Sequence, residues 1–330
     1  MKEILKRLVC AYGPSGREDG IRKCIMTELA ETQFTVTVDA LGNLIATKSG
    51  QGKRLLLAAH MDEIGLMVTN IDDKGFLRFA PVGGHTPAIL FGARVCFADG
   101  TIGTIGSGKI DDPKKLELDK LFIDAGFSSQ NEAKGKIEIG SIATFAPHFA
   151  LQSNRIFAKS LDNRAGCALL IALAKSLPLL DYQLDLVFTV QEEVGLRGAR
   201  TAAYQLKPDM ALAVDVTRTG DTPETPICMA VELGKGPAIK VKDSSIICHP
   251  QVKALLEAAA DKEGIPYQLE VLERGGTDAG AIHLCREGVP TGAISIPARY
   301  VHTPVEVIDY GDLEGGLALL GAFCREFNKN

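Results

Sequence analysis

Residues 185–200 read DLVFTVQEEVGLRGAR and join a short apolar run to two adjacent carboxylates. The run from Leu186 to Val190 is rich in β-branched and aromatic residues, which predicts a strand buried on both faces. Glu192 and Glu193 follow it, and charges at the end of a buried strand cost several kcal/mol unless a partner compensates them. An exposed Glu-Glu turn is the alternative, and this stretch alone does not decide between the two.

The place of the two glutamates in a sheet suggests what could compensate their charge. Open α/β sheets keep their ligand sites at the carboxyl ends of their strands. One carboxylate could hold a metal ion while its neighbour moves a proton, because adjacent residues of an extended chain point in opposite directions. This hypothesis requires further metal-binding side chains at the ends of other strands.

The composition excludes several classes of protein. The chain has 330 residues, 46% of them hydrophobic, and a net charge of −5 from 36 basic and 41 acidic residues. No basic stripe marks a nucleic-acid partner. The charged, amphipathic N-terminus is no signal peptide, and no apolar run approaches the roughly 20 residues that span a membrane. The eight cysteines are scattered without a CxxC motif, which predicts small buried thiols and a cytoplasmic protein.

The secondary-structure patterns divide the chain into two regions of different character. Residues 54–59 form a second doubly buried strand pattern, and alternating strand and helix patterns resume after residue 153. Between 68 and 152, short β-like runs alternate with glycine turns, as in a small sandwich or barrel. We therefore predict an α/β domain made of residues 1–67 and 153–330, with a β-rich domain inserted at 68–152.

Two smaller patterns predict where helices begin. Ser15 and Glu18 have the spacing of a capping box for a helix at about 17–32. In the segment RGGTDAGAI at 274–282, Thr277 and Asp278 could cap a further helix, while the glycines before them permit close approach of the backbone.

Four further segments place metal-binding side chains beside apolar runs: His60 and Asp62 after one strand, Asp162 before a helix, Asp215 after a second strand and His302 after a third. Taken singly, an aspartate can cap a helix or a turn, and a lone histidine is more often a satisfied core or surface residue. Together with the glutamate pair they match the donors that two divalent ions in a shared site need. Such ligands suit zinc, cobalt or manganese, and the lack of cysteine argues against a closed structural zinc site.

Six segments, in order along nearly the whole chain, carry a family resemblance: AHMDEIGL (59–66), SLDNRAG (160–166), QEEVGLRGA (191–199), AVDVT (213–217), RGGTDAGAI (274–282) and YVHTP (300–304). They closely resemble the cytoplasmic dinuclear metallo-aminopeptidases that assemble into tetrahedral particles. That family includes glutamyl and deblocking aminopeptidases, and some members are labelled endoglucanases. The resemblance implies a mixed central sheet with helices on both faces, of the metallo-exopeptidase type, and a barrel-like inserted domain.

The resemblance implies a role for each residue of the expected metal site. It makes Asp162 the bridge between two ions, with His60 and Asp215 on one ion and Glu193 and His302 on the other. Zinc or cobalt is the expected metal, with manganese as a further candidate.

Three other roles follow from the same resemblance. Glu192 would be the general base that deprotonates the metal-bridging water and passes the proton to the leaving amine. Asp62 would orient the imidazole of His60 and raise its basicity. The peptide between Asp162 and Asn163 would be strained, can be cis, and would aim the bridging carboxylate.

The loop at 274–278 has two readings. The resemblance places Gly276, Thr277 and Asp278 beside the active site, where they would contact the N-terminal end of the substrate. The plainer alternative is that the loop only caps the helix that follows.

The resemblance also implies self-association. About 100 residues separate His60 from Asp162 and only 22 separate Glu193 from Asp215, so the inserted domain comes early in the chain. In the family, this domain mediates dimers, and dimers build a homododecamer. The insert departs from the family at His85 and in GTIGSGKIDDP (103–113), which puts specificity and assembly geometry in question. His85 and His148 are not expected to bind metal.

The function that these patterns favour is a metal-dependent aminopeptidase acting on short cytoplasmic peptides. A deacylase or other amide hydrolase with the same two-ion centre is the alternative. A glycan-binding or glycan-cleaving protein is disfavoured, because the chain has no Trp and only 6% aromatic residues, and because a glycosidase needs no histidine-rich metal set. The preferred N-terminal residue does not follow from these segments.

Overall fold

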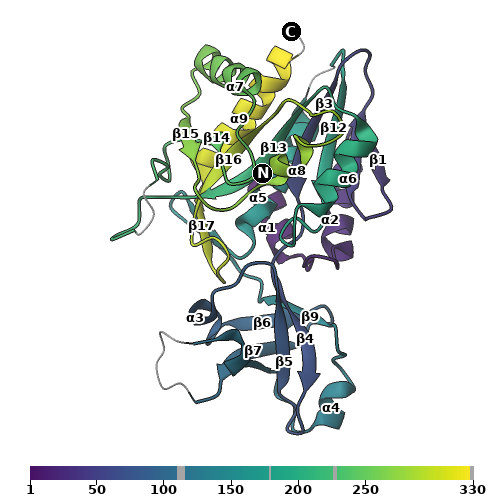
Figure 1. The fold of residues 1–330 in the computed structure, drawn as a ribbon, viewed down its shortest axis with the longest axis vertical. Coiled ribbons are helices and arrows are strands. Elements are labelled where there is room, and N and C mark those ends of the chain that lie inside the picture. Colours follow the sequence, from purple (N-terminus) through teal and green to yellow (C-terminus); the bar gives the residue numbers. More distant parts are fainter. Residues whose placement is uncertain (110–115, 178–179, 226–228, 328–330) are drawn as a thin grey trace.

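A computed structural model describes residues 1–109, 116–177, 180–225 and 229–327. It consists of a large α/β body with a small β-barrel attached at one end (Figure 1). The predicted fold class, an α/β protein with a mixed central sheet, helices on both faces and a β-rich insertion, is confirmed.

Parallel strands form the centre of the main sheet. In spatial order they are β12 (Gln183–Thr189), β3 (Arg54–His60), β13 (Met210–Arg218) and β16 (Thr291–Arg299). Thr189 lies opposite His60 in the register of β12 and β3, and Asp215 lies opposite Ser295 in the register of β13 and β16. The carboxyl ends of these strands therefore meet at one edge of the sheet.

Shorter strands extend the sheet on both sides, mostly in antiparallel pairing. They are β1 (Thr35–Val38), β2 (Leu44–Lys48), β10 (Phe149–Gln152), β11 (Arg155–Ala158), β14 (Ala238–Lys242), β15 (Gln268–Val271) and β17 (Glu306–Asp309). β17 pairs with both β16 and β11, so it lies inside the sheet, directly after the segment that carries His302.

Helices cover both faces of the sheet (Figure 1). One face packs on α1 (Lys2–Cys10), α2 (Asp19–Leu29), α5 (Leu161–Ser176), α7 (Pro250–Glu263) and α9 (Tyr310–Phe327), and the other on α6 (Arg197–Leu206) and α8 (Asp278–Ile282). Along β3, Leu55, Leu57 and Ala59 enter the first core, whereas Leu56 and Ala58 enter the second. This explains why the strand is apolar at every position instead of alternating.

Six antiparallel strands close the barrel around a separate apolar core. They are β4 (Gly65–Ile71), β5 (Leu77–Val82), β6 (Arg94–Phe97), β7 (Ile102–Ser107), β8 (Leu121–Asp124) and β9 (Ile142–Phe145), accompanied by α3 (Pro87–Leu90), α4 (Gln130–Lys134) and η2 (Leu118–Lys120). The predicted boundaries at 68 and 152 need correction, because β4 begins at Gly65 and β10 already belongs to the main sheet.

Some predicted details lie outside the described residues or differ from them. Residues 110–113 of the insert segment that departs from the family, and Cys228, lie outside the described residues. Of the seven described cysteines, four are buried, Cys24 and Cys96 are half-buried and Cys10 is exposed, so the prediction of buried thiols is only partly right. None of the helices in the described part of the chain combines the length and apolarity that a membrane span needs.

Candidate metal centre

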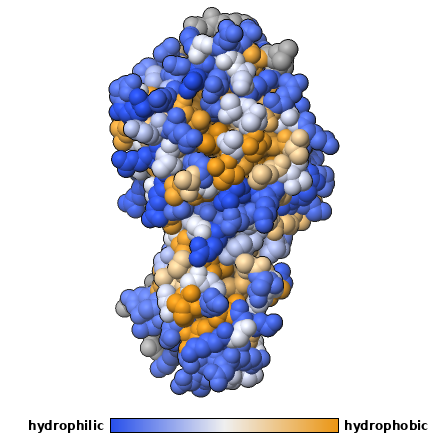
Figure 2. Space-filling view, turned by 90° about the vertical axis from the view of Figure 1, so that its right-hand side faces the viewer, coloured by the Kyte–Doolittle hydropathy of each residue, from blue (hydrophilic) through white to orange (hydrophobic). Residues whose placement is uncertain are grey.

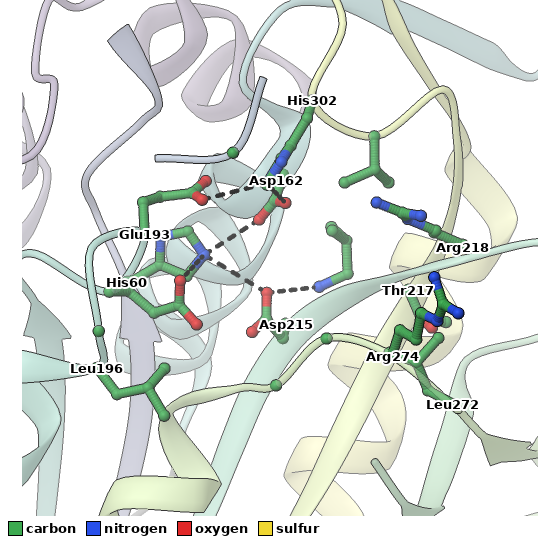
Figure 3. Close-up of a pocket in the computed structure, with 17 residues that line it drawn as sticks. His60, Asp162, Glu193, Leu196, Asp215, Thr217, Arg218, Leu272, Arg274 and His302 are labelled. Carbon is green, nitrogen blue, oxygen red and sulfur yellow. Dashed lines mark hydrogen bonds and ion pairs between the residues drawn. The ribbon is translucent and has the colours of Figure 1, made fainter. Parts of the chain in front are cut away.

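A cavity of about 620 Å³ opens at the edge of the sheet where the four parallel strands end. Its walls include all five residues predicted to bind metal, together with Glu192. His60 ends β3 and Asp215 lies near the end of β13, whereas Glu193 and His302 follow β12 and β16 in loops and Asp162 stands at the start of α5. Figure 3 shows the side chains of these five residues facing one another.

Asp162 lies between two imidazoles. Its Oδ1 is 3.1 Å from Nε2 of His60, and its Oδ2 is 3.3 Å from Nε2 of His302. Asp162 stands in the first turn of α5, where its peptide bond to Asn163 is cis and the Asn163 amide donates to the Val214 carbonyl at 2.8 Å. One carboxylate therefore faces two separate donor groups, one on each oxygen.

A second carboxylate joins each imidazole. Asp215 Oδ1 is 3.6 Å from Nε2 of His60, and Glu193 Oε2 is 3.1 Å from Nε2 of His302. The candidate ligand atoms form two trios that share Asp162, and within each trio all atoms lie within 4.8 Å of one another. Neither trio contains a thiol, and their nitrogen and carboxylate donors fit divalent ions.

Glu192 lines the same cavity but belongs to neither trio. Its Oε2 is 4.0 Å from Nε2 of His60, and its side chain is 11% exposed, so it does not point freely into solvent. Burial raises the pKa of Glu192 well above its ordinary value, and the charges of Asp215 and Glu193 raise it further against the opposing effect of His60. The carboxylates around Glu192 therefore carry more negative charge than the nearby imidazole can balance, as expected of a site that binds cations.

Asp62 holds the backbone of the glutamate pair. Its Oδ1 accepts the N–H of Glu192 at 3.0 Å, and its Oδ2 accepts the N–H of Glu193 at 3.3 Å and the hydroxyl of Ser15 at 2.6 Å. The Nδ1 of His60 lies 3.2 Å from the Asp62 carbonyl oxygen and 3.6 Å from its carboxylate. The expected contact with His60 exists, but it runs mainly through the backbone of Asp62.

The Ser15 contact also corrects a prediction. The helix after it, α2, begins at Asp19, and neither Ser15 nor Glu18 caps it with its side chain. The Ser15 hydroxyl donates to Asp62 instead, and Glu18 accepts the N–H of Gly16 at 2.6 Å. The spacing of the pair was therefore coincidental, and Ser15 supports the site.

Glu306 is a residue that sequence reasoning missed. Its Oε2 accepts the N–H of Asp162 at 2.9 Å, and its Oε1 accepts the N–H of His302 at 2.8 Å. The carboxylate is buried, and burial together with the charge of Asp162 raises the pKa of Glu306 to about 8. A charge opening the apolar run EVID, four residues after His302, was the signal that could have revealed it.

A buried ionic cluster supports the segment that follows His60. Glu63 accepts from the ammonium group of Lys159, from the Ser160 hydroxyl at 2.5 Å and from the Arg164 guanidinium at 3.3 Å. Lys159, Ser160 and Arg164 flank Asp162 in sequence. The cluster therefore ties the loop after β3 to the beginning of α5, which carries the shared carboxylate.

The glycine loop reaches the cavity only in part. Gly275 and Gly276 line it, whereas Thr277 and Asp278 are buried and do not belong to its wall. Contact of Gly276, Thr277 and Asp278 with the substrate stays a prediction. Thr277 occupies the N-cap position of α8, and the Asp278 carboxylate accepts the Thr189 hydroxyl.

The two histidines of the insert stay outside both trios. Nε2 of His85 lies 2.8 Å from the carbonyl oxygen of Gly65, and burial lowers the pKa of His85 and of His148. The insert nevertheless reaches the cavity, because Gly84 forms part of its wall.

The model of one protein family, described as M42 glutamyl aminopeptidase, matches residues 42–319. The chain belongs to the M42 glutamyl aminopeptidase family. It is a hydrolase of the aminopeptidase class, as the resemblance implied, and the comparisons do not favour the deacylase alternative.

Similar proteins span nearly the whole chain. A predicted aminopeptidase of Acetivibrio thermocellus is 52% identical over 321 residues, or 97% of each chain. The lysyl aminopeptidase of Pyrococcus furiosus is 36% identical and covers 98% of this chain and 96% of its own. The Pyrococcus horikoshii TET1 peptidase, which can assemble into a tetrahedron or a large octahedral shell, has a structure with a TM-score of 0.88 at 37% identity, covering 97% of this chain and 98% of that one.

Proposed function

We propose that this aminopeptidase removes N-terminal residues from short peptides in the cytoplasm, using two divalent ions and a glutamate that moves the proton. One observation carries the proposal: Asp162 faces two imidazoles, and each imidazole has a carboxylate partner of its own. An exposed glutamate turn or a helix cap would need no such arrangement.

The donor set fits the ions. His60 and Asp215 would hold one ion, Glu193 and His302 the other, and Asp162 both. Zinc and cobalt suit these donors best, and manganese suits them as well. When bound, the ions would supply Lewis acidity that polarises the peptide carbonyl and makes the attacking water more acidic.

Glu192 would carry the proton. Its carboxylate lines the cavity without belonging to a trio, so it would remain free to accept a proton from the attacking water. The same carboxyl group would then donate that proton to the amine nitrogen of the departing peptide. A positioned general base contributes roughly 10²–10⁴ in rate. Asp62 supports the assignment, because it holds the backbone N–H of Glu192 and so limits where the side chain can swing.

Self-association through the barrel is the second part of the proposal. Ile89, Phe91, Ile102 and Ile139 of the inserted segment leave between 37% and 60% of their surface exposed. Figure 2 shows apolar residues at the surface of the barrel as well as of the main body. Exposed apolar residues of this kind support a barrel-mediated dimer. The tetrahedral assembly of the Pyrococcus horikoshii TET1 peptidase supports a dodecamer built from such dimers. Light scattering coupled to size-exclusion chromatography measures the assembly, and a monomeric particle would contradict this part.

The enzymatic part is tested by metal removal. EDTA should abolish hydrolysis of aminoacyl p-nitroanilides, and cobalt or zinc should restore it. Parallel assays with N-acylated amino acids separate the aminopeptidase from the deacylase. Hydrolysis of the acylated substrates alone would overturn the proposal in favour of the deacylase.

A further inference from the structure

We propose that Gly83 and Gly84, which follow β5 of the inserted barrel, are positioning residues for one of the two metal ions. Their backbone packs against Glu193 and His302, the two side chains that form a trio with Asp162. The inference rests on the proposed two-ion centre. It gives the inserted barrel a role in metal binding besides the proposed self-association.

The imidazoles of the two trios are supported in different ways. Nδ1 of His60 lies 3.2 Å from the carbonyl oxygen of Asp62, and His60 is only 2% exposed. No described residue forms a hydrogen bond with Nδ1 of His302, whose side chain is 27% exposed. A histidine that binds metal usually has its second nitrogen hydrogen-bonded, which fixes the orientation of the ring. The ring of His302 therefore needs another kind of support.

The glycine pair at 83 and 84 lies where this support is needed. A β-carbon added to Gly84 would lie 3.2 Å from Nδ1 and 3.4 Å from Cε1 of His302. A β-carbon added to Gly83 would lie 3.3 Å from Cβ of Glu193 and 2.7 Å from Cγ2 of Ile64. Non-bonded carbon atoms are most stable about 3.5–4.0 Å apart, so a side chain at either position would displace its neighbours. The backbone of the pair thus packs directly against two ligands of the same trio.

The barrel anchors this glycine pair. The pair directly follows β5, and Ile64, which packs against it, belongs to the apolar core of the barrel. Nε2 of the next residue, His85, lies 2.8 Å from the carbonyl oxygen of Gly65 at the start of β4. The His85 ring also packs edge-on against Phe145 of β9, with ring centroids 6.3 Å apart. The barrel therefore fixes the pair, and the pair limits how far the two ligands can move.

The other trio has no contact of this kind. His60 and Asp215 lie on neighbouring strands of the main sheet, and no other glycine of the described insert approaches a side chain of either trio as closely. Figure 3 shows Glu193 and His302 in the upper part of the site and His60 and Asp215 in the lower part. A change in the glycine pair should therefore weaken the binding of one ion and spare the other.

Gly84→Ala tests this contact without straining the backbone. The φ angle of Gly84 lies outside the left-handed region, whereas Gly83 has a φ of +81° that would strain any other residue. The added methyl group would push the imidazole of His302, or the loop itself, by a few tenths of an ångström. Binding sites need their residues within about 0.5 Å of the productive geometry, so the shift should lower the affinity for the ion.

Room for the substrate is the alternative role of Gly84, because this residue also lines the cavity. In that case a side chain at this position would raise KM and leave metal binding unchanged. Metal binding measured in the absence of substrate distinguishes the two roles.

The experiment titrates the metal-free protein with Co²⁺ and follows it by calorimetry and by the visible absorption of the bound ion. The wild type should bind two ions per chain. Gly84→Ala should bind one of them about 10- to 100-fold more weakly and the other within about twofold of the wild type. The larger Gly84→Val should bind one ion per chain at Co²⁺ concentrations that saturate both sites of the wild type.

A double-mutant cycle links the effect to His302. In the His302→Ala background, the remaining ion should bind equally well with and without Gly84→Ala, because the contact is already lost. In the His60→Ala background, where the other ion remains, Gly84→Ala should lower the affinity for that ion by the same factor of about 10 to 100. A merely structural effect of Gly84→Ala would not depend on which histidine is present.

Gly108→Ala is the matched control. Gly108 belongs to the same barrel, and its φ angle also lies outside the left-handed region. A β-carbon there would have its nearest neighbour, the carbonyl oxygen of Lys120, 4.0 Å away. This variant should bind both ions as the wild type does. A cooperative thermal transition near that of the wild type verifies that the metal-free Gly84 variants are folded.

Two results would overturn the inference and leave the proposed function intact. One is binding of both ions with the affinity of the wild type in Gly84→Ala and Gly84→Val, whether or not KM rises. The other is an equal loss of affinity for both ions, which would show a general disturbance of the centre. A wild type that binds no second ion, or that hydrolyses aminoacyl substrates without metal, would instead contradict the proposed function.

Discussion

The carboxylate of Asp62 accepts the backbone N–H of Glu192 at 3.0 Å, across 130 residues of sequence. Asp62 stands just after β3 and Glu192 just after β12, and these two strands are parallel neighbours. The register therefore brings the loop after one strand against the loop after the other. The proposed base is thus held by a buried carboxylate from the adjacent strand end.

Replacement of Asp62 by Asn should lower activity without unfolding the chain. The amide oxygen can still accept one backbone N–H, but the amide nitrogen cannot accept the second, so the backbone of Glu192 or Glu193 loses a partner. Loss of a hydrogen-bonding group that positions the residues of a metal site typically lowers metal affinity or activity about 10- to 100-fold. Steady-state kcat/KM with metal content measured in parallel checks this. Ser15→Ala removes only the third hydrogen bond to Asp62, so it should lower kcat/KM less than Asp62→Asn does. An equal or larger decrease would contradict the role assigned to Asp62.

Glu306→Gln should weaken metal binding. Glu306 accepts the backbone N–H groups of Asp162 and His302, which belong to the trio that also contains Glu193. The glutamine keeps one acceptor oxygen and loses the other, so one of these segments is released. Metal affinity should fall about 10- to 100-fold by titration of the metal-free protein. Glu314→Gln, at an exposed position of α9, is the control, and equal affinities in both variants would contradict the positioning role.

The pH dependence of stability should carry a signature of Asp312. This carboxylate on α9 is buried and accepts the N–H groups of Gly234 and Gly236 at 2.7 and 2.8 Å. Burial raises the pKa of Asp312 to about 6, above its value in the unfolded chain, and the two N–H groups offset only part of that effect. Because the pKa of Asp312 is higher in the folded state than in the unfolded chain, protonation of Asp312 stabilises the folded state. This contribution to the free energy of unfolding is fully present at pH values below the pKa of the unfolded chain. That contribution is lost as the pH rises through about 6.

Urea unfolding of the wild type and Asp312→Asn between pH 4 and pH 7 tests this signature. The stability of the wild type relative to the variant should decline across that interval and level off above it. Asp73→Asn, which removes a charge at an exposed position, should show no comparable decline. A difference that grows with pH would mean that the sign of the shift is wrong.

The strand ends were predictable because their sequence pattern is strong. Runs that are apolar at every position predicted buried parallel strands, and the carboxyl ends of parallel strands share one edge. His60, Asp215 and the glutamate pair therefore had to lie near one another once the fold class was known. Asp162 and His302 were candidates from the same pattern, but their convergence depends on a helix start and a loop, and only the family resemblance gave each of them a role.

The supporting contacts could not be predicted, because they depend on how loops close. Ser15 satisfied the spacing of a capping box, yet its hydroxyl donates to Asp62, a partner 47 residues away. Thr277 and Asp278 followed two exposed glycines, yet the turn into α8 buries both. Glu306 lies in a four-residue strand whose pairing between β16 and β11 has no local signature. These cases share one cause: a hydrogen-bond partner distant in sequence overrides a local pattern.

Glu192→Gln tests the central claim most directly, because this side chain lines the cavity but belongs to neither candidate trio. The variant should bind as many divalent ions per chain as the wild type does. Its kcat on the best aminoacyl p-nitroanilide should fall by roughly 10²–10⁴, because the glutamine cannot accept the proton. Metal content by elemental analysis and kcat on the same preparation give both values. A variant that keeps its ions and the full kcat of the wild type would contradict the mechanism.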